Sequence, residues 1–428
     1  MILIGTRDAR DTATFAQASS GATPAHGGLF TPRDWKRWND IDDLLKLPWA
    51  LRCAVILERL IGDEFERAVI DEIVREAFDF EAPLVRLADG SLVLELFHGP
   101  TLAFKDFGAR FLAAVLTRIP SRGPRMILTA TSGDTGAAVA HAFWRKIGVR
   151  VVVLYPRGRV SPLQERQIAA LGENVSTFAV DGSFDDCQAL VKTCFADRTL
   201  SADLGLTSAN SINIARLLAQ LLYYFEGAAS ARKSGVAGRL VVSVPSGNFG
   251  NLCAGLMAWK AGLPVHAFCA ATNANDTVPR FLDGGAYEPR TSIATISNAM
   301  DVGAPSNWER IAGLFGHDLT AMRAQLRSEA VDDAATAAEI KRLNSIGYTA
   351  CPHTAVASRV LRTQLAAGET GMFLATAHPA KFMEVLQPIL GRTVEIPERL
   401  ASMAQRPVLS ESIDTNAAAF VTRLRALV

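Results

Sequence analysis

Short apolar runs alternate with amphipathic stretches along most of the chain after residue 92. Runs rich in β-branched residues predict strands at residues 92–97, 126–131, 149–155, 175–180, 240–244, 265–271 and 372–376. Apolar positions at helical spacing predict helices over residues 134–147, 162–171, 184–197, 211–226 and 250–261. Alternation of apolar strands with helices is typical of parallel sheets covered on both faces. The pattern therefore predicts an α/β fold.

The first 90 residues follow a different pattern. Stretches 41–62 and 63–78 have apolar residues at helical spacing and acidic residues near their starts, which predicts helices. We therefore interpret residues 1–90 as an N-terminal accessory domain, a layer of helices. We divide the remaining chain into two predicted parallel-sheet domains, 91–238 and 239–428, each containing one of the glycine-rich turns described below.

Composition limits the binding partners and the cellular compartment that we expect for this protein. The chain has 428 residues and a net charge of +1, so its overall field provides no electrostatic attraction for nucleic acid or an anionic membrane. Six cysteines include no C-x-x-C pair, which indicates buried free thiols in a reducing compartment. No apolar window is long enough to span a membrane, and the first residues do not resemble a signal peptide. We expect a cytoplasmic protein. No histidine pair has metal-binding spacing, so we expect no metal site.

Lys105 is the first candidate for chemistry. It ends an apolar run just after a Gly99-Pro100 breaker, and apart from His98 the nearest cationic residues are Arg86 and Arg110. A partly desolvated lysine has a lowered pKa, and its amine becomes a nucleophile and base suited to Schiff-base chemistry. For an isolated lysine the alternative, a surface side chain with its charge in water, is the better interpretation.

A first glycine-containing turn follows the predicted strand 126–131. It contains Ser132, Gly133, Asp134 and Thr135, and it opens a predicted helix. Backbone N–H groups at such a helix start can face an anion, here a carboxylate. The alternative is an ordinary helix cap made by the serine or the aspartate.

A second turn follows the predicted strand 240–244. It contains Gly247, Asn248, Phe249, Gly250 and Asn251, again at the start of a predicted helix. The two glycines allow several N–H groups to converge on a phosphate, although the spacing matches no nucleotide-binding motif. A plain tight turn is the alternative.

Together, the lysine and the two turns favour one cofactor. A group bearing both an aldehyde and a phosphate would satisfy the lysine and the second turn, and an amino-acid substrate would satisfy the first. Pyridoxal 5'-phosphate has both functional groups.

Several motifs support this interpretation. They occur in order along most of the chain, at residues 27–32, 97–106, 130–136, 208–216, 246–251, 271–280, 297–301 and 376–382. In these motifs the chain resembles the threonine synthases, pyridoxal-phosphate enzymes that share the fold of the tryptophan synthase β-subunit, called fold type II. The resemblance implies two parallel-sheet domains around one cofactor site.

The resemblance also implies roles for particular residues. Lys105 would form the internal aldimine, and residues 247–251 would hold the cofactor phosphate. Thr376 would bond to the pyridine nitrogen, as a neutral hydroxyl that does not enforce ring protonation. Residues 132–135 would face the substrate carboxylate, and Asn213 and Arg216, three apart on one helix, would lie near the substrate phosphate.

The sequence leaves the roles of two residues in these motifs open. Many members of the wider fold family have asparagine where this chain has Asp134, and an ionised carboxylate would repel a phenolate-like cofactor oxygen. Lys381 could contact an anion or merely cap a sheet edge.

The implied reaction is the last step of threonine biosynthesis. O-phospho-L-homoserine and water would give L-threonine and phosphate through γ-elimination and β-hydration. We expect a small-molecule substrate and a monomer or weak homodimer. One alternative is a phospho-lyase that releases α-ketobutyrate from the same substrate. Another is a binding protein without catalysis, which the presence of Lys105 disfavours.

Overall fold

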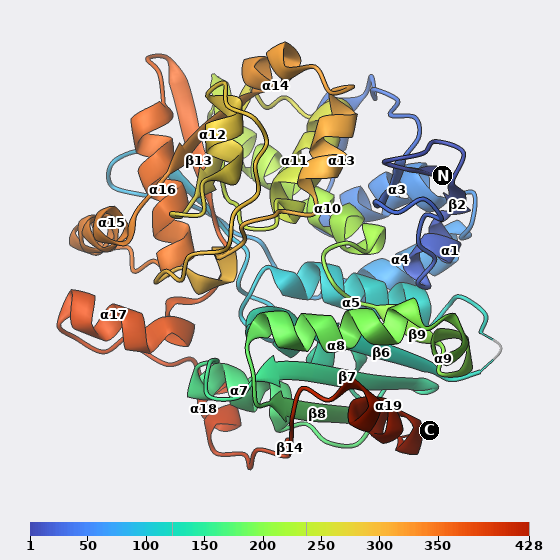
Figure 1. Cartoon of the computed structure of the whole chain (residues 1–428). Coiled ribbons are helices and arrows are strands. Elements are labelled where there is room, and N and C mark those ends of the chain that lie inside the picture. Colours follow the sequence, from blue (N-terminus) through green and yellow to red (C-terminus); the bar gives the residue numbers. More distant parts are fainter. Residues whose placement is uncertain (122, 237, 428) are drawn as a thin grey trace.

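The structure, a computed structural model, describes residues 1–121, 123–236 and 238–427, and its strands form three sheets (Figure 1). The largest sheet has six strands in the order β12-β11-β10-β13-β5-β4, with all neighbours parallel except the edge pair β4 and β5. Its strands are β4 (Leu84–Arg86), β5 (Leu92–Glu95), β10 (Arg239–Pro245), β11 (Ala267–Thr272), β12 (Leu326–Ala330) and β13 (Glu369–Ala375).

The second sheet has five strands, all parallel, in the order β14-β8-β7-β6-β9. They are β6 (Arg125–Ala130), β7 (Val149–Pro156), β8 (Val175–Val180), β9 (Leu206–Ser208) and β14 (Glu411–Ile413). The predicted α/β class, with two parallel sheets covered by helices, is confirmed by this architecture.

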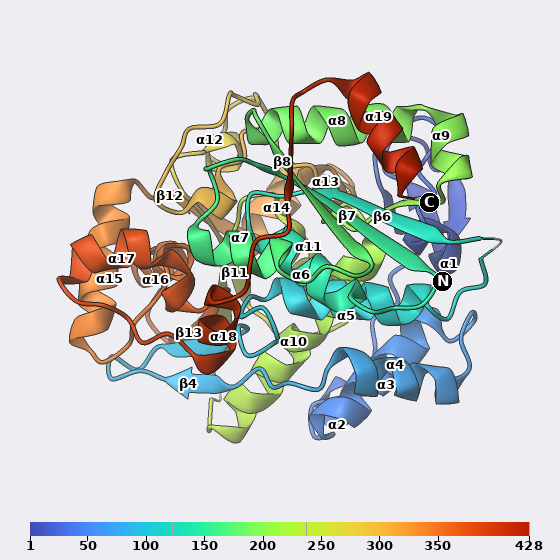
Figure 2. The ribbon, with the colours of Figure 1, turned by 90° about the horizontal axis from the view of Figure 1, so that it is seen from below.

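The helices cover the faces of both parallel sheets. They are α1 (Phe15–Ser19), α2 (Ile41–Leu44), α3 (Trp49–Ile61), α4 (Arg67–Ala77), α5 (Lys105–Leu116), α6 (Asp134–Phe143), α7 (Pro162–Ala169), α8 (Phe184–Ala196), α9 (Arg198–Asp203), α10 (Ile214–Lys233), α11 (Gly250–Lys260), α12 (Thr277–Leu282), α13 (Trp308–Leu314), α14 (Leu319–Gln325), α15 (Asp333–Ser345), α16 (Pro352–Gln364), α17 (Met383–Leu390), α18 (Glu398–Ala404) and α19 (Ala417–Ala426). In Figure 2, α8 and α19 lie on one side of strands β6 to β8, and α5 and α6 lie on the other.

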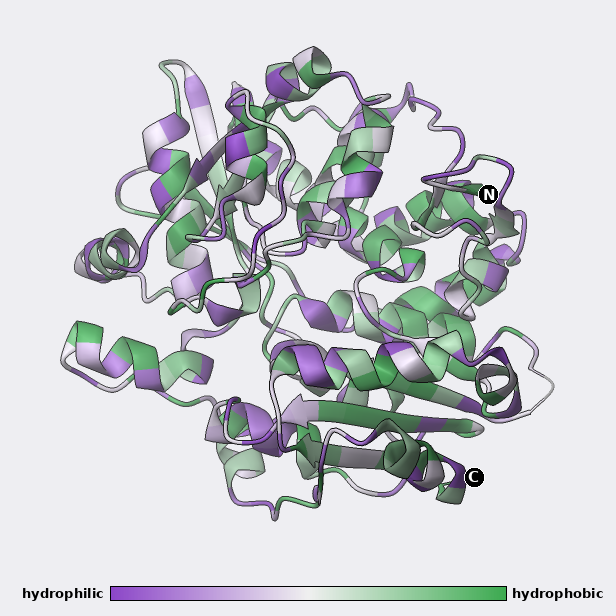
Figure 3. Cartoon of the chain, in the orientation of Figure 1, coloured by the Kyte–Doolittle hydropathy of each residue, from purple (hydrophilic) through white to green (hydrophobic). Residues whose placement is uncertain are grey.

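Side chains that alternate along each strand are buried in different cores. In β6, Ile127 packs with the core shared by α5, α6 and α10, whereas Leu128 packs with α8 and α19. In β10, Val242 and Val241 divide in the same way between that central core and a core beneath α16. Because both faces are buried, these strands are apolar at nearly every position, as Figure 3 shows for β7.

The N-terminal layer differs from the prediction. It contains the predicted helices as α3 and α4, but it also contains an antiparallel sheet of β1 (Ile2–Gly5), β2 (Thr12–Thr14) and β3 (Phe30–Pro32). These strands have three or four residues each, too few to give a clear alternating pattern. The helical layer is therefore only part of this region.

Strand pairing crosses the boundaries we predicted at residues 90 and 238. Strand β4 pairs with β5 across residue 90, and β5 pairs with β13, and β14 with β8, across residue 238. The division into three domains stays a prediction. Helix α5 packs against both α6 and α10, so it joins the parts that the two sheets organise (Figure 1).

All six cysteines are free and buried, as the sequence predicts. Within the described residues, no helix is long and apolar enough to cross a membrane.

Candidate active site

The predicted site residues follow the carboxyl ends of parallel strands. The turn 131–136 follows β6, the turn 246–251 follows β10, and Thr376 follows β13. Lys105 lies ten residues after the end of β5, at the first position of α5. Ligands of α/β sheets bind at this edge, where strands give way to loops and helix starts.

A short antiparallel pairing fixes Lys105 beside Thr376. The backbone N–H of Phe104 donates to the carbonyl of Thr376 at 2.9 Å, and His378 N–H donates to the carbonyl of Leu102 at 3.0 Å. An isolated bridge between residues 103 and 377 lies between these bonds. The start of α5 and the loop after β13 therefore form one unit.

The amine of Lys105 lies in a largely buried position, its side chain 15% exposed. Its Nζ is 3.9 Å from Oδ2 of Asp134. Burial, together with the positive charges of Arg216 and Lys381, lowers the pKa of Lys105 to about 8 against the opposing effect of the Asp134 carboxylate. A useful fraction of this amine is therefore neutral near physiological pH, as nucleophilic chemistry requires.

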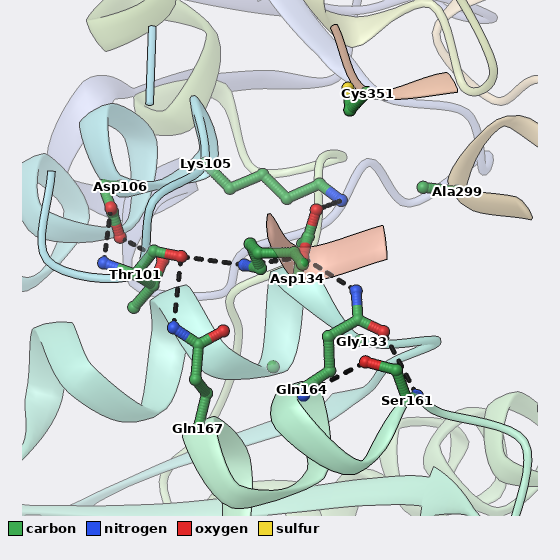
Figure 4. Close-up of polar contacts among 12 residues, drawn as sticks. Thr101, Lys105, Asp106, Gly133, Asp134, Ser161, Gln164, Gln167, Ala299 and Cys351 are labelled. Carbon is green, nitrogen blue, oxygen red and sulfur yellow. Dashed lines mark hydrogen bonds and ion pairs between the residues drawn. The ribbon is translucent and has the colours of Figure 1, made fainter. Parts of the chain in front are cut away.

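Asp134 is the centre of a buried polar cluster (Figure 4). Its Oδ1 accepts from Nζ of Lys381 at 2.7 Å and from Nε2 of Gln164 at 3.0 Å. Burial alone would raise the pKa of Asp134, but Lys381 and Lys105 together hold it well below the usual range. Lys381 also donates to the carbonyl of Thr101 at 2.8 Å. Asp134 is therefore ionised, and Lys381 is a buried partner of an anion, not a cap on the sheet edge.

The first turn leaves backbone donors available. The hydroxyl oxygen of Thr131 accepts from the N–H of Gly133 at 3.0 Å and of Gly136 at 2.8 Å, which curls the chain into α6. Gly133 has φ +142°, a conformation that favours glycine. In the described part of the chain, the N–H groups of Ser132, Asp134 and Thr135 have no protein acceptor. They can face an anionic ligand.

The second turn presents a longer row of free donors. Phe249 adopts a left-handed conformation (φ +60°) just before α11 begins. None of the N–H groups from Gly247 to Asn251 has an acceptor among the described residues. A Cβ on Gly247 would lie 2.6 Å from Cα of Met300, so the backbone of residues 299–300 packs directly against this turn. The donor set and the start of an eleven-residue helix fit a phosphate group.

Neutral side chains hold the second turn in place. Asn248 donates to the hydroxyl of Ser211 at 2.7 Å and accepts from the N–H of Ser306 at 2.6 Å. Its carbonyl accepts from Asn307 at 3.1 Å, and Asn307 in turn accepts from the buried guanidinium of Arg310 at 2.7 Å. A cation thus acts on this turn only through an amide.

Asn251 was predicted to contact the cofactor, but its side chain points into the core. Its Oδ1 accepts from the hydroxyls of Tyr223 and Tyr224 at 2.6 and 2.7 Å, and its Nδ2 is buried without a partner among the described residues. Only its backbone N–H is available to a ligand at the turn. The two tyrosines therefore anchor the start of α11.

Thr376 has a free hydroxyl in a buried position. The residue is 6% exposed, and its hydroxyl has no hydrogen-bond partner within the residues that the structure describes. Such a neutral donor and acceptor suits a heteroaromatic ring nitrogen.

The two residues predicted near a substrate phosphate have different surroundings. Asn213 caps α10 by accepting from Ala215 N–H at 3.1 Å, and its amide donates to the carbonyls of Ser19 and Ser208. Arg216 is 2% exposed, donates one Nη to a backbone carbonyl, and forms no ion pair with any described residue. Burial lowers the pKa of Arg216 to about 10. A buried guanidinium without a carboxylate is suited to an anionic ligand.

His353 is a site residue whose position the sequence pattern did not predict. Its Nε2 accepts from Ala299 N–H at 3.1 Å, next to the backbone that packs on Gly247. Burial, together with the charges of Lys105 and Lys381, lowers the pKa of His353 to about 4 against the opposing effect of Asp134. The imidazole is therefore neutral, and it connects the second turn with the lysine cluster. The motif 297–301 was a signal for this contact.

Comparison with known families agrees with this geometry. The family described as pyridoxal-phosphate dependent enzyme matches residues 80–376, and the C-terminal region of threonine synthase matches residues 354–424. The chain is 52% identical over 421 residues to threonine synthase from Escherichia coli, with 98% of each chain covered. It is 34% identical to threonine synthase from Pseudomonas aeruginosa, covering 95% of this chain and 94% of that one.

Solved structures give the same result. The crystal structure of threonine synthase from Escherichia coli matches with a TM-score of 0.94 at 51% identity, covering all of both chains. A pyridoxal-phosphate-bound threonine synthase from Brucella melitensis matches with a TM-score of 0.93 at 33% identity, over 100% of this chain and 99% of that one. The similarity therefore extends over both parallel sheets and the N-terminal region.

Proposed function

From the premise that this chain belongs to the threonine synthases, a family of pyridoxal-phosphate-dependent lyases, we propose that it converts O-phospho-L-homoserine and water to L-threonine and phosphate. Pyridoxal phosphate is its cofactor. The buried Lys105 amine, between a turn of free donors on each side and beside the Thr376 loop, is the observation that supports this assignment most directly.

The residues fit the cofactor at both of its ends. When bound, pyridoxal phosphate supplies an electron sink that makes the protons on the carbons of an amino acid removable. The free N–H groups from Gly247 to Asn251 would hold its phosphate, and the Thr376 hydroxyl would meet its ring nitrogen. A neutral hydroxyl does not hold a proton on that nitrogen, so more of the control over proton transfer falls to Lys105.

Lys105 would act in three ways. Its neutral amine would hold the cofactor covalently, and after release it would remove the Cα proton of the substrate and later return one to Cα. Its pKa of about 8 suits both directions of transfer, because neither protonation state is strongly disfavoured near neutral pH. The flexible side chain can reach more than one carbon of the same substrate.

The substrate would be held by its two anionic groups. The free N–H groups of Ser132, Asp134 and Thr135, with Gly133 shaping the turn, would face the carboxylate. The unpaired Arg216 guanidinium would attract the phosphate. Because the amide of Asn213 is fully used by backbone groups, we assign it the role of fixing the start of α10, which carries Arg216.

The test begins with purified protein supplied with cofactor. The wild type should show a visible absorbance band of covalently held cofactor and should form threonine from O-phospho-L-homoserine. Lys105→Ala should lose the band and at least about 10³-fold of the rate. Lys192→Ala, an exposed lysine on α8, is the matched control and should behave as wild type.

Two outcomes would contradict the proposal. Release of α-ketobutyrate in place of threonine would indicate a phospho-lyase. Absence of the band in cofactor-saturated wild type would exclude Lys105 as the cofactor lysine.

We further propose three properties of the protein in the cell. It would act in the cytoplasm, as a monomer or weak homodimer, with the five-stranded and the six-stranded sheet moving relative to each other to exclude water from the bound substrate. Sedimentation at several concentrations tests the oligomeric state.

A further inference from the structure

Lys381 is as deeply buried as any charged group in the described chain, with a side-chain exposure of 0%. Its Nζ has two partners, Oδ1 of Asp134 at 2.7 Å and the carbonyl oxygen of Thr101 at 2.8 Å. Burying an ammonium group is costly unless it is paired and hydrogen-bonded. A hydrophobic side chain would fill the same space without that cost, so the charge itself needs an explanation.

The two carboxylate oxygens of Asp134 face different lysines. Oδ1 forms a direct ion pair with Lys381, whereas Oδ2 lies 3.9 Å from Nζ of Lys105, beyond hydrogen-bond distance. Gln164 adds a third contact to Oδ1 at 3.0 Å. The carboxylate is thus already neutralised on the side away from Lys105.

A single buried lysine beside a single carboxylate would form a tight ion pair. Such a pair holds the amine protonated and fixes its position, which would remove a nucleophile from use. Here a second cation competes for the same carboxylate. The competition is built into the fold, because Lys381 is held by the Thr101 carbonyl at a fixed position.

We propose that Lys381 is a positioning residue that takes up the negative charge of Asp134, so that Lys105 remains an unlocked amine. This inference rests on the proposed role of Lys105. The ion pair of Asp134 and Lys381 also presents no net charge to the bound cofactor.

The other charged groups around Lys105 do not provide this function. Arg216, on α10, repels a proton on Lys105 but has no bond to Asp134. His353, at the start of α16, is neutral. Within the described chain, Lys381 is the cation in direct contact with Asp134.

The test measures Lys105 itself, in protein without cofactor. The rate of acetylation by acetic anhydride is followed at Lys105 by peptide mass spectrometry from pH 6 to pH 11 (roughly the range in which lysines titrate). The wild type should show a midpoint near pH 8. In Lys381→Met and Lys381→Gln, Lys105 becomes the one cation among the described residues within 4.0 Å of Asp134, and its midpoint should rise by about one pH unit or more.

Two variants separate this effect from general damage. Asp134→Asn combined with Lys381→Met removes both charges, so the midpoint should return to the wild-type value or below. Lys146→Met breaks a half-buried ion pair with Glu76 beyond the C-terminal end of α6 and should leave the midpoint unchanged. Circular dichroism shows that each variant is folded before its midpoint is read.

A folded Lys381 variant with an unchanged midpoint would overturn the inference. So would a rise that persists in the double variant, because Asp134 would then not be its cause. If the Lys381 single variants fail to fold, Asp134→Asn is compared with the double variant. Its midpoint must be lower, because Lys381 then only repels the positive charge of protonated Lys105. Failure of the proposed function is visible separately, as absence of the cofactor band in wild-type protein.

Discussion

The two glycine turns of this protein, 131–136 and 246–251, have the same place in their sheets and different electrostatic character. Each follows a buried parallel strand, opens a helix and leaves a row of backbone N–H groups free. The first carries a buried carboxylate between two lysines. The second carries no charged side chain, and the cation nearest in its network, Arg310, acts through the amide of Asn307.

The difference shows that the same strand–turn–helix arrangement can create two different electrostatic environments. At the second turn, neutral N–H donors around a helix start would hold the cofactor phosphate without changing the protonation of neighbouring groups. At the first turn, charge is concentrated, and it acts on Lys105, the proposed catalytic lysine. A phosphate-binding turn needs only neutral N–H donors. Around a reactive amine, positive and negative charges must offset each other so that the amine can lose its proton.

The largest effect should come from removing the charge at the first turn. Asp134→Asn leaves Lys381 buried without a counter-ion, which we expect to lower the free energy of unfolding by about 3 kcal/mol. Urea denaturation of the cofactor-free protein at pH 7 measures the change. Asp43→Asn, which breaks an exposed pair with Lys46, should change stability by less than about 0.5 kcal/mol. If both variants lost the same free energy of unfolding, the buried ion pair would stabilise the protein no more than the exposed one, and the prediction would be wrong.

Stability should also depend on pH through this carboxylate. Because the folded pKa of Asp134 lies below its unfolded value, its contribution is complete above about pH 5 and is lost as the pH falls through the unfolded and then the folded pKa. The wild type should therefore lose its advantage over Asp134→Asn in acid, and a constant difference down to low pH would count against the ion pair.

A smaller effect should follow from adding volume at the second turn. Gly247→Ala places a methyl group 2.6 Å from the backbone Cα of Met300, which cannot move as a side chain can. The turn must shift, and cofactor affinity should fall about a hundredfold, measured by absorbance titration. Gly313→Ala, with no atom near the added methyl, is the control. An unchanged affinity would remove this turn from the cofactor site.

The smallest effect should come from giving the second turn the charge of the first. Asn248→Asp keeps the bond from Ser306 N–H, and Ser211 can donate to the new carboxylate. The added anion should repel a bound phosphate and weaken the cofactor about tenfold, less at high salt. Titrations at two salt concentrations test this, and a gain in affinity would contradict the neutral design.

Much of the fold after residue 92 could be predicted, for a physical reason. Strands buried on both faces are continuous apolar runs, so β6, predicted at 126–131, is found at Arg125–Ala130. Edge strands lack this signal. β14 reads Glu-Ser-Ile and pairs on one side only, and β2 has one buried residue between two exposed ones. Local pattern could not reveal them, because three residues with at most one buried side chain form no continuous or alternating apolar run.

The candidate site likewise has features that local sequence predicts and features that depend on contacts between distant parts of the chain. Lys105 and both turns were visible as local motifs, since a turn is specified by its own glycines. The ion pair of Asp134 and Lys381 joins residues far apart in sequence, and no local pattern predicts it. The side chain of Asn251 lies in the predicted motif but turns toward two tyrosines, a direction set by the packing of α10 against α11.

The antiparallel pairing of residues 102–104 with 376–378 has a mechanical consequence. It holds Lys105, Thr376 and Lys381 in one hydrogen-bonded unit, whereas Asp134 follows β6 of the five-stranded sheet. Any rotation of one sheet against the other must change the separation of Asp134 from both lysines while this unit keeps its shape. The electrostatic state of the amine would then report the angle between the sheets, so that opening and closing of the molecule would set its reactivity.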